Sequence, residues 1–374
     1  FFLMACEMFT LGGRSIQRPG LGSYLKMAAS EGDVRALLYG LGALIFLIVL
    51  MDKLLWRPLV VWAERFKQEL TASPIVTRSL TLELLSRSRL LAVLGEKVLL
   101  PLTDALDRSL NRYLASRCRE RSAVFRWGRV GTILLVLAGG SILSYGAVRS
   151  TNLLIQLHPE DLMVILVATG ATFLRVMAAQ MLALAWVLPL GVAIGLNVRL
   201  AQLLQPIVQI VASIPATSLF PGLLLLLLGL PGGLNLAAIS LMLFASQWYL
   251  LFNVIAGAMA IPRDLREVAA VLRIRGIEQW RSLILPAIFP YLVTGMIEAT
   301  GGCWNAAIVA EYVEFGGRTY VTTGLGSLIT LTSQEGNYPL LLASTLTMAA
   351  TVVAINRSCW RRLYRIAEEK YRLE

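Results

Sequence analysis

The chain has 374 residues, of which 57% are hydrophobic and 15% are charged, and its mean hydropathy is +0.69. Soluble globular domains are less apolar and about a quarter charged, so this composition excludes an ordinary soluble protein. The net charge of +11 does not indicate nucleic-acid binding, because the basic residues gather in loops between long apolar runs, a distribution that membrane insertion explains.

Seven apolar runs are long enough to cross a lipid bilayer as helices. A run of about 18 or more apolar residues with few charges is typical of a transmembrane helix, because each backbone amide must be hydrogen-bonded within its own segment. The sequence therefore predicts an all-α, polytopic membrane protein with about seven transmembrane helices. The predicted spans are 36–55, 131–149, 173–196, 206–229, 234–257, 287–308 and 338–356.

The basic residues between these runs predict the orientation of the chain. Segment 57–130 holds 14 Lys and Arg against 7 Asp and Glu. Segment 261–286 holds five Arg against three acids, and the C-terminal tail is also basic. Lys- and Arg-rich loops stay on the cytoplasmic side. Alternating the seven spans places all three basic segments in the cytoplasm and leaves 150–161 and 309–337 outside.

The last seventy residues repeat the first seventy at a fixed offset of 304 positions. The segment 131–304, which precedes the second copy, has no counterpart before the first copy. We therefore expect residues 1–56 to be the tail of a first membrane module, with further spans of that module upstream. Segment 57–130 would then be a basic cytoplasmic linker and 131–374 a complete second module; the alternative is chance alignment of apolar sequence. Matched residues are Glu7 and Glu311, Gly12-Gly13-Arg14 and Gly316-Gly317-Arg318, Gly20-Leu21-Gly22-Ser23 and Gly324-Leu325-Gly326-Ser327, Glu31-Gly32 and Glu335-Gly336, and Trp56-Arg57 and Trp360-Arg361.

The cytoplasmic loop 263–286 carries the clearest functional pattern. It predicts a short amphipathic helix, a turn at Gly276 and a second helical stretch that ends at Pro286. Ala269 and Ala270 are small residues beside a charged rim, a combination that suits docking of the helix into a groove of a partner protein. The alternative is a surface helix without a partner.

This loop resembles the coupling loop of ABC importer permeases, in which Glu-Ala-Ala is followed by a Gly and then by an Ile close to a Leu-Pro pair. Glu267, Ala269, Ile284 and Pro286 carry the resemblance. Val268 replaces one family Ala, and Arg273 stands where the family has its Gly, so the resemblance leaves the family's tight bend open. It implies that Glu267, Ala269, Ala270, Gly276, Ile284 and Pro286 form the ATPase-coupling loop.

Other segments are similar to the nitrate, sulfonate, taurine and bicarbonate branch of these permeases. The resemblance implies a six-helix core like that of type I importers, import of a small anionic solute, and a place in the bacterial inner membrane. It also implies three partners: ATP-binding cassette ATPase subunits, an extracytoplasmic solute-binding protein and a second permease module. The similar segments are Thr172-Phe-Leu-Arg-Val176, Pro189-Leu-Gly191, Ala212-Ser-Ile-Pro-Ala216, Phe220-Pro221 and Trp304-Asn-Ala-Ala-Ile-Val-Ala-Glu311.

The sequence lacks the Gly-x-x-x-x-Gly-Lys-[Ser/Thr] pattern of a phosphate-binding loop. ATP hydrolysis is therefore expected in separate subunits, and we expect no catalytic residue, cofactor or metal site in this chain. Its single histidine and four scattered cysteines show no spacing typical of metal ligands.

Polar residues near membrane depth are costly and are the candidates for the solute pathway. Each could instead make a hydrogen bond between helices. Glu298 is expected to pair with Arg175, and Pro215 to open the backbone hydrogen bonds of a span. For Glu311 a structural place at a helix end, or a contact at the rim for the binding protein, is the favoured alternative. The candidates are Gln209, Ser213, Pro215, Glu298, Asn305 and Glu311.

Two other functions stay open from the sequence. A secondary transporter would use ion gradients and would need ionisable groups along its pathway, which spans 206–229 and 234–257 largely lack. A non-transporting membrane scaffold would need no ATPase. Purification together with an ATPase distinguishes both from an ATP-driven importer.

Overall fold

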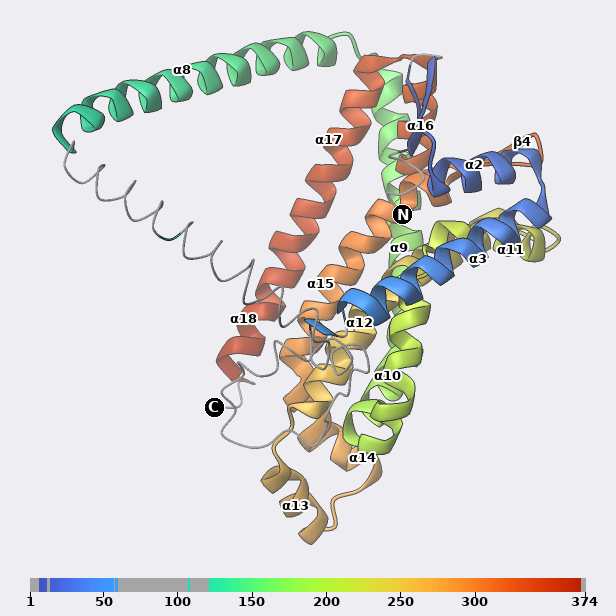
Figure 1. The fold of residues 1–374 in the computed structure, drawn as a ribbon, viewed down its shortest axis with the longest axis vertical. Coiled ribbons are helices and arrows are strands. Elements are labelled where there is room, and N and C mark those ends of the chain that lie inside the picture. The colour runs from blue at the N-terminus through green and yellow to red at the C-terminus, as the bar shows by residue number, and fades with distance from the viewer. Residues whose placement is uncertain (1–6, 12–13, 57, 60–106, 108–120, 371–374) are drawn as a thin grey trace. The chain divides into compact units, whose positions relative to one another are not determined.

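The computed structural model describes residues 7–11, 14–56, 58–59, 107 and 121–370. It divides into two compact units, Phe1–Ile48 with Gln156–Glu374, and Val49–Ile155. The smaller unit contains helix α8 (Arg121–Leu154), which covers the predicted span 131–149. Most of the predicted linker 57–130 lies outside the described residues. All the long elements are helices, so the predicted all-α membrane fold is confirmed (Figure 1).

Five helical segments of the described residues are long and apolar enough to cross a membrane, or six if one bent pair counts as a span. Each overlaps a predicted span, one of them as a bent pair, whereas the predicted span 131–149, which lies in α8, is not among them. Helix α9 begins 14 residues before its predicted start, and its 38 residues exceed the roughly 20 that cross a bilayer. The helices are α3 (Val34–Met51), α9 (Pro159–Leu196), α10 (Val198–Ala212), α11 (Ala216–Leu227), α12 (Gly233–Met259), α15 (Leu285–Ala310) and α17 (Tyr338–Ile355).

The predicted span 206–229 is not one straight helix, because the structure breaks it into α10 and α11, which meet at an angle of 83° and count as a span only as a bent pair. The break lies at Ser213, Ile214 and Pro215. Proline has no backbone N–H and disfavours helical geometry in the residue before it, so α10 cannot continue. Ser213 caps the broken end by donating its hydroxyl to the carbonyl oxygen of Gln209 at 2.7 Å.

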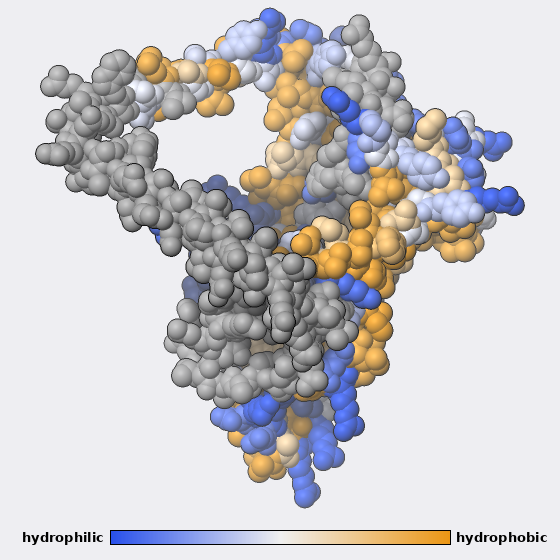
Figure 2. All heavy atoms as spheres, viewed as in Figure 1, coloured by the Kyte–Doolittle hydropathy of each residue, from blue (hydrophilic) through white to orange (hydrophobic). Residues whose placement is uncertain are grey.

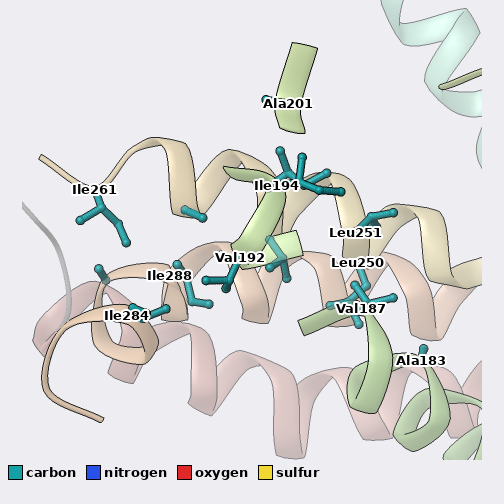
Figure 3. Close-up of a cluster of buried hydrophobic side chains, with 14 of the residues drawn as sticks. Ala183, Val187, Val192, Ile194, Ala201, Leu250, Leu251, Ile261, Ile284 and Ile288 are labelled. Carbon is teal, nitrogen blue, oxygen red and sulfur yellow. The ribbon is translucent and has the colours of Figure 1, made fainter. Parts of the chain in front are cut away.

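The core of the larger unit forms where α9, α12 and α15 pack together (Figure 3). Glycines allow the helix backbones to approach closely. A Cβ at Gly195 of α9 would lie 2.7 Å from the carbonyl oxygen of Ile255 in α12, and one at Gly295 of α15 would lie 3.1 Å from the Cα of Leu250. Small residues at contact points are typical of helices that associate inside a membrane.

The internal repeat is also a structural repeat. Every element of the first copy recurs 304 residues later with the same bounds. Gly32 and Gly336 close the equivalent helices in left-handed conformations, with φ of 73° and 74°. The paired elements are β1 (Met8–Leu11) and β3 (Tyr312–Phe315), β2 (Arg14–Gln17) and β4 (Arg318–Val321), α2 (Leu21–Glu31) and α16 (Leu325–Glu335), α3 and α17, and the π-helical turns η1 (Asp52–Trp56) and η4 (Asn356–Trp360).

The orientation can be tested with single cysteines in a chain whose native cysteines are serine. Glu278 and Glu335 are both exposed, on loops that the basic residues place on opposite sides. Cysteine at position 278 should react with a membrane-impermeant maleimide only after the membrane is opened, and cysteine at 335 should react in intact cells. Reaction of the first variant in intact cells would contradict the topology.

Candidate functional site

The loop between α12 and α15, which the basic residues predict to be cytoplasmic, is anchored at both ends in the hydrophobic core. Ile261 precedes the loop, Ile284 ends it, and both side chains are buried beside Ile288 of α15 (Figure 3). Pro286 lies in the first turn of α15, where its missing N–H has no helical partner to lose. A displacement of the loop must therefore move α12 and α15. Between the anchors lie α13 (Arg263–Val271), α14 (Gly276–Gln279) and the π-helical turn η3 (Trp280–Ile284).

The loop makes its tight bend even though Arg273, instead of a glycine, occupies the position of the bend. Arg273 adopts a left-handed backbone with φ of 54°, and Ile274 donates its N–H to the carbonyl oxygen of Ala269 at 2.9 Å, which closes α13. The predicted turn at Gly276, with φ of 63°, is a second bend three residues later. A left-handed conformation costs a residue with a side chain about 1–2 kcal/mol, so the loop keeps its bend at the expense of local stability.

The alanines do not form the exposed face that the sequence predicts. Ala269 is only 4% exposed and points into the protein, whereas Ala270 is exposed, so the expected shared docking face of small residues is wrong. The loop instead exposes large apolar side chains among charged ones, at the end of the unit where hydrophilic residues gather (Figure 2). We call Val268, Val271, Leu272 and Ile277 the coupling surface.

The coupling surface has the properties of a protein contact. Val271 is 81% exposed and Ile277 is 79% exposed. They lie on a loop between two spans that carries five arginines. A group of exposed apolar side chains rimmed by charge is typical of a docking site for another protein. Glu267 is exposed beside this surface at its charged rim.

At the opposite end of the helices a buried ion pair joins α9 to the start of the second hairpin. The Nη1 atom of Arg175 lies 2.6 Å from Oε1 of Glu311, whose side chain is 0% exposed. Thr172 donates its hydroxyl to the same carboxylate at 2.8 Å, and Gly326 donates its backbone N–H at 2.8 Å. Arg175 also donates to the amide oxygen of Asn235, so this network connects α9, α12, α15 and α16.

These contacts correct one prediction. The sequence paired Arg175 with Glu298, but Arg175 pairs with Glu311, and Glu298 accepts a hydrogen bond from Nδ2 of Asn253 at 2.9 Å. Glu311 is fully buried and holds the N-terminus of α16. The structure therefore favours a structural role for Glu311 over a role in the solute pathway.

Glu7 in the first copy holds α2 in a similar way, because its Oε2 accepts the backbone N–H of Ser23 at 2.9 Å. A side chain at Gly20 or at Gly324 would overlap the carboxylate of Glu7 or Glu311 respectively. The need for this space explains why both the glutamate and the glycine recur in the repeat.

A polar stripe runs along α15. Among the residues of α15, all described, only Tyr291, Glu298 and Asn305 are exposed, and they are spaced seven residues apart. Because seven residues make nearly two helical turns, the three lie on one face. Gly301 lies between Glu298 and Asn305 with open space beyond its Cα. We call Tyr291, Glu298 and Asn305 the α15 stripe.

The remaining pathway candidates lie apart from this stripe. Gln209 and Ser213 are exposed near the C-terminal end of α10, which packs on α9, and Pro215 caps the N-terminus of α11. Glu298 and Asn305 lie together on α15. With Glu311 in the buried ion pair, the structure therefore divides the predicted pathway residues among three places.

Residues 187–372 match the family model described as binding-protein-dependent transport system inner membrane component. The chain is 30% identical over 147 residues to the nitrate import permease protein NrtB of Leptolyngbya laminosa, covering 39% of this chain and 51% of that protein. It is 29% identical over 168 residues to the bicarbonate transport system permease protein CmpB of Synechococcus elongatus, covering 45% and 57%. It is 24% identical over 160 residues to the taurine transport system permease protein TauC of Escherichia coli, covering 43% and 54%.

The chain thus spans about half the length of the curated relatives it matches. The family match includes the coupling loop, the α15 stripe and the second copy of the repeat. The family is one of transport permeases rather than enzymes. The multi-pass helical fold, the anchored loop and these matches together show that the chain belongs to the binding-protein-dependent transport system inner membrane components, the permeases of ABC importers.

Proposed function

We propose that this chain is the membrane-spanning subunit of an ATP-driven importer for a small anionic solute in the bacterial inner membrane. Its partners would be separate ATPase subunits, an extracytoplasmic solute-binding protein and a second permease module, on the same full-length chain or on another subunit. The observation that carries the proposal is the coupling surface, an exposed apolar docking face on a loop whose two ends are anchored in the membrane core.

The loop can transmit force because it is short and its base is packed. An ATPase subunit bound to Val271 and Ile277 would push the loop when it closes on ATP. Ile261 and Ile284 would pass this displacement to α12 and α15, since interiors are densely packed and deform little. The membrane end would respond with alternating access to the solute path.

The α15 stripe is the proposed lining of that path. Exposed polar side chains at membrane depth face water or a protein partner, because contact with lipid is costly. Asn305 and Tyr291 can donate hydrogen bonds to an anion. The carboxylate of Glu298 would repel an anion, but it accepts a bond from Asn253 of α12, and this bond ties together the two helices that hold the loop.

The solute class rests on the names of the relatives and on the neutral donors of the α15 stripe. The matched relatives carry names for nitrate, bicarbonate and taurine transport, and each of these solutes carries an anionic group. The stripe supplies neutral donors that could replace the hydration of a small anion. We therefore propose a small oxyanion or a sulfonate as the solute.

Uptake in proteoliposomes that contain the chain with its ATPase and binding protein tests the proposal. Labelled nitrate, bicarbonate and taurine serve as separate probes. Uptake of at least one should require ATP on the coupling-loop side and persist when ion gradients are collapsed. Uptake that follows an ion gradient without ATP would show a secondary transporter and overturn the proposal.

A substitution in the stripe tests the path itself. Asn305→Asp adds a negative charge where the anion would pass, and should lower uptake about tenfold or more, since like charges a few ångströms apart repel by more than 1 kcal/mol in a protein. Asn337→Asp is the matched control, because Asn337 caps α17 by accepting the N–H of Leu340, and aspartate caps helices equally well. Equal uptake in both variants would remove the stripe from the path.

A further inference from the structure

The two copies of the repeat bind each other reciprocally on the side of the molecule opposite the coupling loop. Strand β3 of the second copy contacts helix α2 of the first, and strand β1 of the first contacts helix α16 of the second. All four elements belong to one compact unit (Figure 1). The reciprocal pattern is that of a two-fold axis between the copies, as in isologous contacts between two protein subunits.

Backbone hydrogen bonds define this contact. Gly316 and Gly317 form the turn of the second hairpin, with φ of 57° and 70°. Gly316 donates its N–H to the carbonyl oxygen of Ala29 at 3.2 Å, and Gly317 donates to that of Ser30 at 2.8 Å. These carbonyls lie in the last turn of α2, where a helix has few partners of its own to offer, and that of Ala29 also accepts the N–H of Gly32 at 3.1 Å. The hairpin turn of one copy therefore caps the helix of the other.

Glycine is needed on both sides of the contact. A Cβ at Gly32 would lie 3.0 Å from the Cα of Gly316, so a side chain there would push the hairpin away. The repeat has glycine at the equivalent positions of both copies, Gly12-Gly13 with Gly316-Gly317 and Gly32 with Gly336. The sequence thus keeps glycine at the equivalent turn and helix end of both copies.

One charged pair breaks the symmetry. Lys26 and Glu314 lie on the contacting elements α2 and β3. The negative charge of Glu314, which also accepts a hydrogen bond from the hydroxyl of Tyr312 at 2.8 Å, raises the pKa of Lys26 against a larger lowering by burial. The 304-residue offset places Thr330 at the position equivalent to Lys26, and Thr10 at the position equivalent to Glu314. The ammonium and the carboxylate therefore occur at one of the two symmetry-related places, and threonines occupy the other.

This difference distinguishes the three ways in which two hairpin-and-helix elements could pair. In a pair of first-copy elements, both half-buried Lys26 residues would lie opposite Thr10. In a pair of second-copy elements, both Glu314 residues would lie opposite Thr330. Only the pairing of unlike copies brings the ammonium to the carboxylate.

We propose that the hairpin and helix of each copy form the surface by which two permease modules recognise each other, and that Lys26 and Glu314 restrict this surface to unlike modules. The inference rests on the proposed pairing of two modules. It adds the contact that brings the modules together and the residues that select the partner.

The test uses the full chain with a protease site inserted in the linker 57–130 and an affinity tag at the C-terminus. After cleavage in mild detergent, the retained fraction of the N-terminal fragment reports the contact. Glu314→Lys and Lys26→Glu each place like charges together and should lower the equilibrium constant for retention about fivefold, near the upper limit for a partly exposed pair. The double exchange Lys26→Glu with Glu314→Lys should restore retention to within about twofold of the parent, because it restores opposite charges.

Glu278→Lys is the matched control, since it makes the same charge change on the exposed cytoplasmic loop. It should leave retention unchanged. Retention that is equal in all variants, or that stays low in the double exchange while the variants remain monodisperse, would overturn the selective role of the pair.

A second measurement does not depend on charge variants that fold poorly. Lys26→Cys with Glu314→Cys, in a chain whose other cysteines are serine, should be joined by a short bismaleimide, which spans more than a disulfide does, and the fragments should then stay together on a denaturing gel. Absence of this crosslink would overturn the contact. Neither measurement uses ATPase or solute, so failure of the transport proposal and failure of this contact give different results.

Discussion

Replacement of Arg175 by alanine is expected to lower the free energy of unfolding by about 3–5 kcal/mol, because it leaves a buried carboxylate without its counter-charge. Glu311 is 0% exposed and lies 2.6 Å from the guanidinium, so water cannot replace the lost partner. The same variant also frees the amide oxygen of Asn235 from two hydrogen bonds. Unfolding by sodium dodecyl sulfate in mixed micelles measures the change.

Arg199→Ala is the matched control, because Arg199 is an exposed arginine at the start of α10. Its replacement should change the unfolding free energy by no more than about 0.5 kcal/mol. The double variant Arg175→Gln with Glu311→Gln should recover much of the loss, since it removes both charges and keeps polar groups for Thr172 and Gly326. A cost for Arg175→Ala that equals the control would contradict the structural role of the pair.

Replacement of Val271 and Ile277 by aspartate is expected to abolish ATP-driven transport while the membrane fold persists. Both side chains are almost fully exposed, so the free chain loses little packing. In the complex, two carboxylates would enter an apolar contact and remain unpaired there. Truncation of central apolar contacts typically costs an interface 2 kcal/mol or more, so ATPase binding should weaken about thirtyfold or more. Co-purification of the ATPase measures this binding.

Val198→Asp is the control for this variant. Val198 is an exposed valine in the first turn of α10, where an acidic residue is compatible with the helix dipole. It should keep both ATPase binding and transport. Normal transport by the Val271→Asp, Ile277→Asp variant would show that the coupling surface is an ordinary surface loop.

Hydrophobicity and charge were sufficient to predict most of the fold. Long apolar runs predicted the helices because lipid leaves backbone groups no other partner. The repeat was visible in the sequence for two reasons. A glutamate recurs where its carboxylate holds the start of a helix, and glycines recur where a turn needs a positive φ. The sequence placed opened backbone hydrogen bonds at Pro215, but it did not divide the run into two helices, because the run stays apolar from α10 to α11 and hydropathy alone does not register an 83° bend.

The site was predicted less completely because its contacts join distant segments. Arg175 lies in an apolar run, which marks it as a residue that needs a partner, but two glutamates were available and only the three-dimensional packing selects Glu311. The inward position of Ala269 also depends on how α13 rests on the core. The α15 stripe had a sequence signal in the seven-residue spacing of Tyr291, Glu298 and Asn305.

Site-specific photo-crosslinking at Ile277 tests most directly whether the coupling surface meets an ATPase. A photoreactive amino acid replaces Ile277 in cells that express the complete transporter, and the same residue replaces Val321 on the opposite side as a control. Illumination should join the Ile277 variant covalently to an ATP-binding cassette subunit and leave the Val321 variant free of that adduct. An Ile277 variant that forms no adduct with any ATPase, in cells where the parent transports its solute, would contradict the proposed coupling.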